Sequence, residues 1–215
     1  LPKDALILLA APVYGGRVSP TALERLARLR GQGQAAVAVV VYGNRDYEDA
    51  LLELSDRAKD WGLTPVAAGA FIGEHSYSRP SLPVAEGRPD EDDLKRCRDF
   101  AAAVMEKLHR CGSLEQACDF PVKGSRPYKA LKPSTPQAPI TLPEKCLRCG
   151  SCLKHCPTQA IFRAEDGSMD TDKGRCIKCC TCVKDCPAQA RVFDTPFSEF
   201  LHTHFSARRE PEFFL

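Results

Sequence analysis

The chain has 215 residues, 43% of them hydrophobic, which is enough for at least one buried core and suits one or two domains. Its 30 lysine and arginine residues exceed its 28 aspartate and glutamate residues by only two, so the net charge indicates neither nucleic acid nor a membrane as partner. The longest apolar run, residues 5–13, is about half of the roughly 20 residues that a spanning helix needs, so we expect no membrane span and no signal peptide.

Residues 5–110 alternate between strand patterns and helix patterns. An apolar strand is predicted over 5–14, and Ser19 and Pro20 suit the cap and first position of the helix that follows. The valine-rich run 35–42 is typical of a strand buried on both faces. A helix over 46–61, a strand over 65–72 and a helix over 91–110 complete the series. Strands joined by helical crossovers predict a parallel sheet in an α/β domain, to which we assign residues 1–118.

A segment rich in proline and basic residues follows this domain. Six prolines between residues 120 and 143 alternate with lysine and arginine, which predicts an extended, semi-rigid linker over 119–143.

An internal repeat lies beyond the linker. The pattern CxxCxxCxxxCP begins at Cys146 and recurs 30 residues later at Cys176. Between the copies, Asp166 and Gly167 predict a hairpin turn, because this dipeptide tolerates positive φ. We assign residues 144–194 to a second, small α+β domain and expect a featureless tail over 195–215.

The spacing of the repeated cysteines predicts two [4Fe-4S] clusters. Each cluster takes three thiolates from one loop and the fourth from the other motif. One cluster is therefore assigned to Cys146, Cys149, Cys152 and Cys186, and the other to Cys176, Cys179, Cys182 and Cys156. Cysteines gathered in this way indicate metal binding in a reducing compartment, so we expect a cytoplasmic protein.

Two structural zinc sites are the alternative, since paired C-x-x-C motifs also form four-cysteine zinc sites. The third cysteine of each motif, the proline after the fourth and the second copy favour clusters. Cys180 lies between two ligands, and we interpret it as a small packed residue rather than an alternative ligand. Cys97, Cys111 and Cys118 follow no metal spacing and are expected to be buried.

Several cations surround the predicted ligands. Because a cube with four thiolates is anionic, these cations are expected to favour its reduced state and to guide an acidic redox partner. An ordinary solvated surface is the alternative. The cations are Lys145, Arg148, Lys154, Lys173, Arg175, Lys178 and Lys184.

Two loops at the carboxyl ends of the first two strands combine glycine with tyrosine, over residues 12–17 and 42–47. Ligands of doubly wound sheets bind at this edge. Glycine admits close approach to the backbone, and an aromatic ring stacks on a planar cofactor. A bound ligand and a plain turn are both compatible with this pattern.

Residues 11–17, 41–47 and 71–76, followed by a basic linker and the repeated cysteine motif, resemble a family of flavodoxin-ferredoxin fusion proteins found mainly in anaerobic bacteria. The resemblance implies a flavodoxin-like parallel sheet followed by a bacterial-type ferredoxin domain with two [4Fe-4S] clusters. It also implies FMN contacts at Tyr14, Gly15, Gly16, Tyr42, Gly43 and Asn44.

One feature of that family has no counterpart in this sequence, namely the Ser/Thr/Gly-rich loop that holds the FMN phosphate at a helix N-terminus. The first predicted strand corresponds to the third of a flavodoxin order 2-1-3-4-5. We therefore expect an N-terminally incomplete domain, an exposed apolar edge on its first strand and poor FMN binding by these residues.

These patterns predict an electron carrier that passes electrons through two [4Fe-4S] clusters to or from FMN or a redox partner protein. The alternatives are a flavin-dependent reductase of a small molecule fed by the clusters, and a flavodoxin-like region that serves only for docking. We predict no catalytic residue: His75 is interpreted as a hydrogen-bonded loop residue, and no nicotinamide fingerprint occurs.

Overall fold

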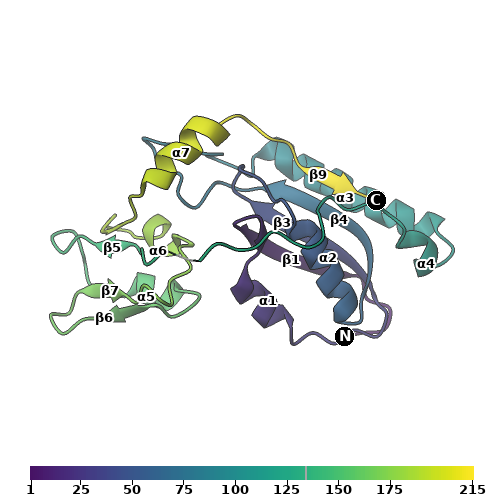
Figure 1. The fold of residues 1–215 in the computed structure, drawn as a ribbon, viewed down its shortest axis with the longest axis horizontal. Helices are drawn as coiled ribbons and strands as arrows, with labels where there is room; N and C mark the ends of the chain where they lie inside the picture. The colour runs from purple at the N-terminus through teal and green to yellow at the C-terminus, as the bar shows by residue number, and fades with distance from the viewer. Residues whose placement is uncertain (134) are drawn as a thin grey trace. The chain divides into compact units, whose positions relative to one another are not determined.

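The computed structural model describes every residue except 134 and divides the chain into two compact units (Figure 1). The first unit contains residues 1–75, 85–132 and 205–215, and the second contains 76–84 and 133–204. The chain therefore passes from one unit to the other four times. This differs from the predicted arrangement, in which a single linker over 119–143 separates two continuous domains.

The first unit is built on a five-stranded sheet with the order β2-β1-β3-β4-β9. The predicted strands form as β1, β3 and β4, and their parallel pairing is confirmed. The short strands β2 and β9 pair antiparallel to β1 and β4, so the sheet is mixed rather than wholly parallel. The bounds are β1 Ile7–Tyr14, β2 Arg17–Val18, β3 Ala35–Tyr42, β4 Thr64–Ile72 and β9 Glu212–Phe214.

Helices cover both faces of this sheet, as the continuous apolar pattern of the central strands predicts. Leu51 and Leu54 of α2 pack on the face that carries Val40 of β3. Phe100 of α3 packs on the opposite face with Val37, and Figure 1 shows α2 and α3 on the two sides. The helices of this unit are α1 Pro20–Leu26, α2 Ala50–Asp60, α3 Glu91–Arg110 and α4 Leu114–Ala117.

An apolar edge lies along β1, as expected. Strand β2 pairs only with Val13 and Tyr14. Near the start of β1, Leu6 and Leu8 are 41% and 68% exposed. Three parallel strands with helices on both faces are present, while the flavodoxin-like identity of the unit stays a prediction.

Residues 119–132 pack along α2 instead of forming a free linker. The backbone N–H groups of Ser125 and Lys129 donate to the two carboxylate oxygens of Asp49, at 2.8 and 2.7 Å. Arg126 binds Asp56 through both Nε and Nη2. Carboxylates at the start of α2 and within it thus hold a segment that its proline and basic residues predicted to be an extended linker.

The second unit contains two small antiparallel ribbons and two short helices. Strands β5 (Ile140–Thr141) and β8 (Arg191–Val192) pair with each other, as do β6 (Ile161–Arg163) and β7 (Met169–Thr171). The β6–β7 turn contains the predicted Asp166-Gly167 hairpin, with Gly167 at φ +80°. The helices are α5 Ser151–His155 and α6 Thr181–Lys184.

The prediction of a featureless tail is wrong. Pro196–Phe205 form α7, in which Leu201 is completely buried, and the last residues form β9. Phe213 of β9 stacks on Phe100 at 4.9 Å between ring centroids. Aromatic side chains thus pack the end of the chain against the hydrophobic core of the first unit. Within the described residues, no helix combines the length and apolar character of a membrane span.

Candidate iron-sulfur centres

Two pockets in the second unit are each lined by four cysteines. In each, three cysteines come from one loop and the fourth from the other repeat, which is the combination that the spacing predicts. The first is lined by Cys146, Cys149, Cys152 and Cys186, and the second by Cys156, Cys176, Cys179 and Cys182.

The four thiols of each pocket surround a space rather than a point. Among the residues that the structure describes, no three His, Cys, Asp or Glu side chains converge closely enough to share a single metal ion. A [4Fe-4S] cube bound by four thiolates needs such an arrangement around a space, and the donor set fits it.

Each three-cysteine loop is shaped by two residues in the left-handed region. They are Arg148 (φ +54°) and Gly150 (φ +77°) in the first loop, and Lys178 (φ +58°) and Cys180 (φ +57°) in the second. Alternation of right- and left-handed residues turns backbone N–H groups to one side of a loop, where they form an anion site. In the second loop the N–H of Lys178 donates to the Sγ of Cys176 at 3.4 Å.

The fourth cysteine of each motif accepts a matching backbone hydrogen bond. The N–H of Ala160 lies 3.2 Å from the Sγ of Cys156, and the N–H of Ala190 lies 3.2 Å from the Sγ of Cys186. Burial by itself would raise the pKa of both thiols, but these N–H groups hold each pKa below its ordinary value. Both sulfurs are therefore prepared to bind metal as thiolates.

In other thiols of the two pockets the effect of burial on the pKa outweighs that of the hydrogen bonds they accept. Burial raises the pKa of Cys152 and Cys176, and it raises that of Cys182 to about 11. Because a metal binds the thiolate, loading of these pockets is expected to release protons.

Cys180 lies in the wall of the second pocket, is 2% exposed and directs its S–H toward the carbonyl oxygen of Lys178 at 3.6 Å. It takes the position of Gly150 in the first repeat, which supports its interpretation as a packed residue. The expected burial of the remaining cysteines is wrong. Cys97, Cys111 and Cys118 are half-buried: Cys97 and Cys111 pack at the border of the core, and Cys118 caps the end of α4.

A comparison with protein-family models now decides between clusters and zinc. Residues 138–187 match the model of the 4Fe-4S dicluster domain. The match spans all eight cysteines of the two motifs and shows a ferredoxin-like domain, which indicates iron-sulfur electron transfer. It covers less than half of the chain, and a search of curated proteins finds no match.

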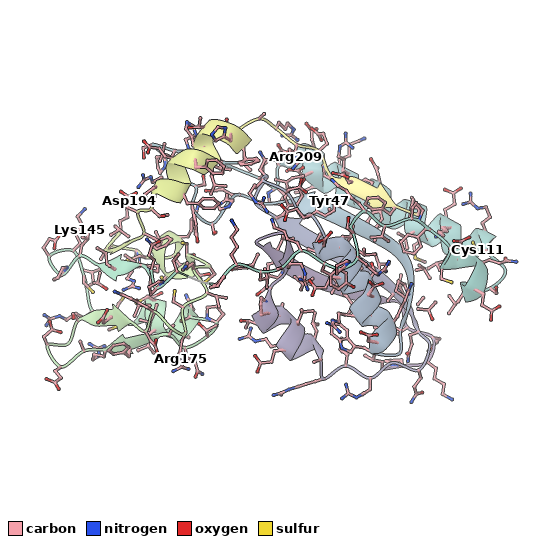
Figure 2. All side chains as sticks on the ribbon, in the orientation of Figure 1. Tyr47, Cys111, Lys145, Arg175, Asp194 and Arg209 are labelled. Atoms are coloured by element: carbon pink, nitrogen blue, oxygen red, sulfur yellow. The ribbon has the colours of Figure 1, made fainter. Side chains whose placement is uncertain are left out.

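The cations predicted around the dicluster domain lie mostly in solvent. Lys145 and Arg175 directly precede the first cysteine of each motif and are exposed (Figure 2). Lys178 is half-buried, and its Nζ donates to Thr135 Oγ1 at 2.9 Å. The first pocket is closer to solvent than the second: Cys149 is exposed whereas Cys179 is half-buried, and the adjacent Leu147 is 70% exposed.

Sequence reasoning missed one residue at this site, Arg191. It lines the first pocket, and its guanidinium lies 3.8 Å from the Sγ of Cys182 in the second. Comparison of the two repeats could have identified it, because an arginine stands where the first repeat has the apolar Ile161.

The two loops expected to contact FMN contain glycines that pack against side chains. Gly15 and Gly16 form the turn between β1 and β2, and Gly43 follows β3. A Cβ added to Gly16 would lie 1.7 Å from Glu48 Oε2, and one added to Gly43 would lie 2.5 Å from His75 Cδ2. These glycines accommodate close contacts within the chain.

The polar positions of the same loops are also engaged. Asn44 is 1% exposed; its Nδ2 donates to the carbonyl oxygens of Phe205 and Ala207 at 2.6 and 2.8 Å. Its Oδ1 accepts from the N–H of Arg209, which is labelled in Figure 2. Tyr42 is 3% exposed within the core, and Tyr14 pairs with Arg17 in the hairpin. FMN contact at these residues stays a prediction, and at Asn44 it requires displacement of the C-terminal segment.

Proposed function

We propose that this protein is an electron carrier that holds two [4Fe-4S] clusters and exchanges electrons with a redox partner protein. The observation that carries the proposal is the pair of four-cysteine pockets, each completed by the opposite repeat, within the segment that matches the dicluster family. The proposed ligands are Cys146, Cys149, Cys152 and Cys186 for the first cluster, and Cys176, Cys179, Cys182 and Cys156 for the second.

When bound, each cluster supplies a centre that exchanges one electron at a time. The chain contributes fixed thiolates, backbone donors and a dry environment. The N–H groups of Ala160 and Ala190 stabilise negative charge on sulfur in both pockets. Buried apolar residues such as Ile161 and Met169, which are 6% and 2% exposed, exclude water from the pocket walls. Hydrogen bonding and burial together set the reduction potential.

The proposed partner is an acidic protein that docks beside the first pocket. That pocket is the more exposed of the two, and the cations Lys145, Arg148 and Lys154, each within two residues of Cys146 or Cys152 in the sequence, are all exposed. Positive charge around an electron-transfer site steers an acidic partner and raises the association rate.

The alternative of a flavin-dependent reductase requires FMN at residues 14–16 and 42–44. We do not adopt it, because both amide atoms of Asn44 already bind the C-terminal segment. Turnover of a small-molecule acceptor by the reduced protein, with no second protein present, would restore this alternative.

Anaerobic purification followed by iron, sulfide and metal analysis tests the proposal. We expect about eight irons and eight sulfides per chain, because two four-iron clusters are bound. Replacement of a proposed ligand, Cys149→Ser or Cys179→Ser, is expected to remove the EPR signal of one cluster. Cys97→Ser is the control, since Cys97 lies on α3 outside both pockets, and it should keep all eight irons. Stoichiometric zinc without iron would overturn the proposal.

A further inference from the structure

Arg191 is a buried cation at a position where the internal repeat has an apolar residue. It follows the fourth cysteine of its motif by five residues, as Ile161 follows Cys156. Arg191 is only 2% exposed. Burial of a guanidinium is costly unless its charge is compensated, so an arginine in place of an isoleucine calls for a specific interaction.

The protein itself offers Arg191 only neutral oxygen partners and one sulfur. Its Nη1 donates to Thr141 Oγ1 at 2.6 Å, and its Nη2 donates to Thr171 Oγ1 at 2.5 Å and to the carbonyl oxygen of Pro139 at 3.0 Å. The sulfur is Cys182 Sγ, 3.8 Å from Nη2. Across the residues that the structure describes, no carboxylate forms an ion pair with this guanidinium.

The Nε of Arg191 is buried and has no acceptor among the described residues. An unsatisfied buried N–H is rare in proteins and indicates a partner that the protein atoms do not provide. The side chain lines the first pocket, where the remaining wall carries the four proposed ligands of the first cluster. Inorganic or cysteine sulfur in that pocket would supply the missing acceptor.

The charge of Arg191 acts on thiols of both pockets. The side chain lines the first pocket together with Cys152 and Cys186, and its Nη2 lies 3.8 Å from the Sγ of Cys182 in the second pocket. One cation therefore favours negative charge at two sites that are built from opposite repeats.

We propose that Arg191 is a positioning residue shared by the two clusters, whose buried charge and N–H donors stabilise the reduced state of both. This inference rests on the proposed function, because it needs both pockets loaded. Reduction adds one electron to a site from an external reductant such as dithionite. No proton is transferred to or from Arg191, because arginine stays protonated throughout the accessible pH range.

Redox titration of the holoprotein followed by EPR tests this role. Arg191→Met removes the charged guanidinium and keeps an unbranched apolar side chain, and we expect the midpoint potentials of both clusters to fall. The predicted change is at least tenfold in the equilibrium between oxidised and reduced cluster, which corresponds to about 59 mV for one electron. Arg191→Lys keeps the charge without the planar fork, so its potentials should lie between those of Arg191→Met and the parent protein.

Lys154→Met is the matched control, because it removes one positive charge from an exposed position on α5. Solvent screens that charge, so its effect on the potentials should be smaller than that of Arg191→Met. A variant Arg191→Met that retains eight irons with both potentials unchanged would overturn the inference. A shift of only one potential would refute the shared role.

A second measurement covers the case in which Arg191→Met fails to assemble its clusters. The parent protein is labelled with guanidino-15N arginine, reduced and studied by pulsed EPR, in a background with Arg148→Lys and Arg175→Lys, which removes the guanidinium groups beside the first cysteines of the two motifs. We expect a 15N coupling at both reduced clusters, and its absence from either overturns the inference. Failure of the proposed function is distinguishable, because the parent protein would then contain no iron.

Discussion

Replacement of Cys180 by glycine separates a packed residue from a cluster ligand. Cys180 is buried and adopts φ +57°, and Gly150 stands at the equivalent position of the first repeat. A left-handed backbone costs an L-residue about 1–2 kcal/mol, and glycine avoids this cost. Glycine also lowers stability by about 0.5–1 kcal/mol, because the unfolded chain gains conformational freedom at that position. Loss of one buried methylene costs about 0.8 kcal/mol, and loss of the sulfur adds to it.

These opposing effects nearly cancel, so Cys180→Gly should change stability by about 1 kcal/mol or less, which is a factor of about 5 in a rate or equilibrium constant. We therefore expect eight irons per chain and a rate of cluster loss in guanidinium chloride within about fivefold of the parent. Cluster loss is followed through the visible absorbance under anaerobic conditions. Cys180→Val is the contrasting variant, because a β-branched side chain is strongly disfavoured at positive φ and should accelerate cluster loss.

An iron content of only about four per chain in Cys180→Gly, the content of a single cluster, would contradict the packed role of Cys180. In that event Cys180 would be a ligand, and the assignment of Cys179 or Cys182 to the second cluster would have to change.

Three further predictions concern the two units. The purified 215-residue protein should release negligible FMN on denaturation, because the amide of Asn44 binds the C-terminal segment; stoichiometric flavin fluorescence would contradict this. Lys154→Glu should slow electron transfer to an acidic acceptor protein more than Arg28→Glu, an equal charge change on an exposed residue of the first unit, and the difference should shrink at high salt. Burial would raise the pKa of Asp56, but hydrogen bonds from Arg126 and Tyr128 hold it below its ordinary value. Asp56 should therefore stabilise the attachment of residues 126–128 above the unfolded pKa of about 3.9, and this stability should be lost as the pH falls through the lower folded value. Hydrogen exchange of that segment in Asp56→Asn, which removes the acid dependence, provides the check.

The elements of the parallel sheet could be predicted because their signals are local. The valine-rich run that forms β3 and the capped helix α3 each lie within one continuous stretch of sequence. Strands β2 and β9 were missed, because two- and three-residue strands carry no periodicity of their own. Residues 119–132 were assigned to a linker on proline content, whereas their position depends on carboxylates of α2 some 70 to 80 residues earlier.

The sequence by itself determined which donor atoms are proposed for the dicluster domain: eight cysteines recur at a repeated spacing, and their order along the chain sets which of them share a loop. Only the tertiary structure decided which residues surround those donors and which residues contact the loops predicted to bind flavin. Arg191 reaches both pockets from β8, and Asn44 is bound by residues more than 160 positions later. Composition and spacing do not predict such contacts. The contacts arise when distant segments pack together and each buried polar group requires a hydrogen-bond partner.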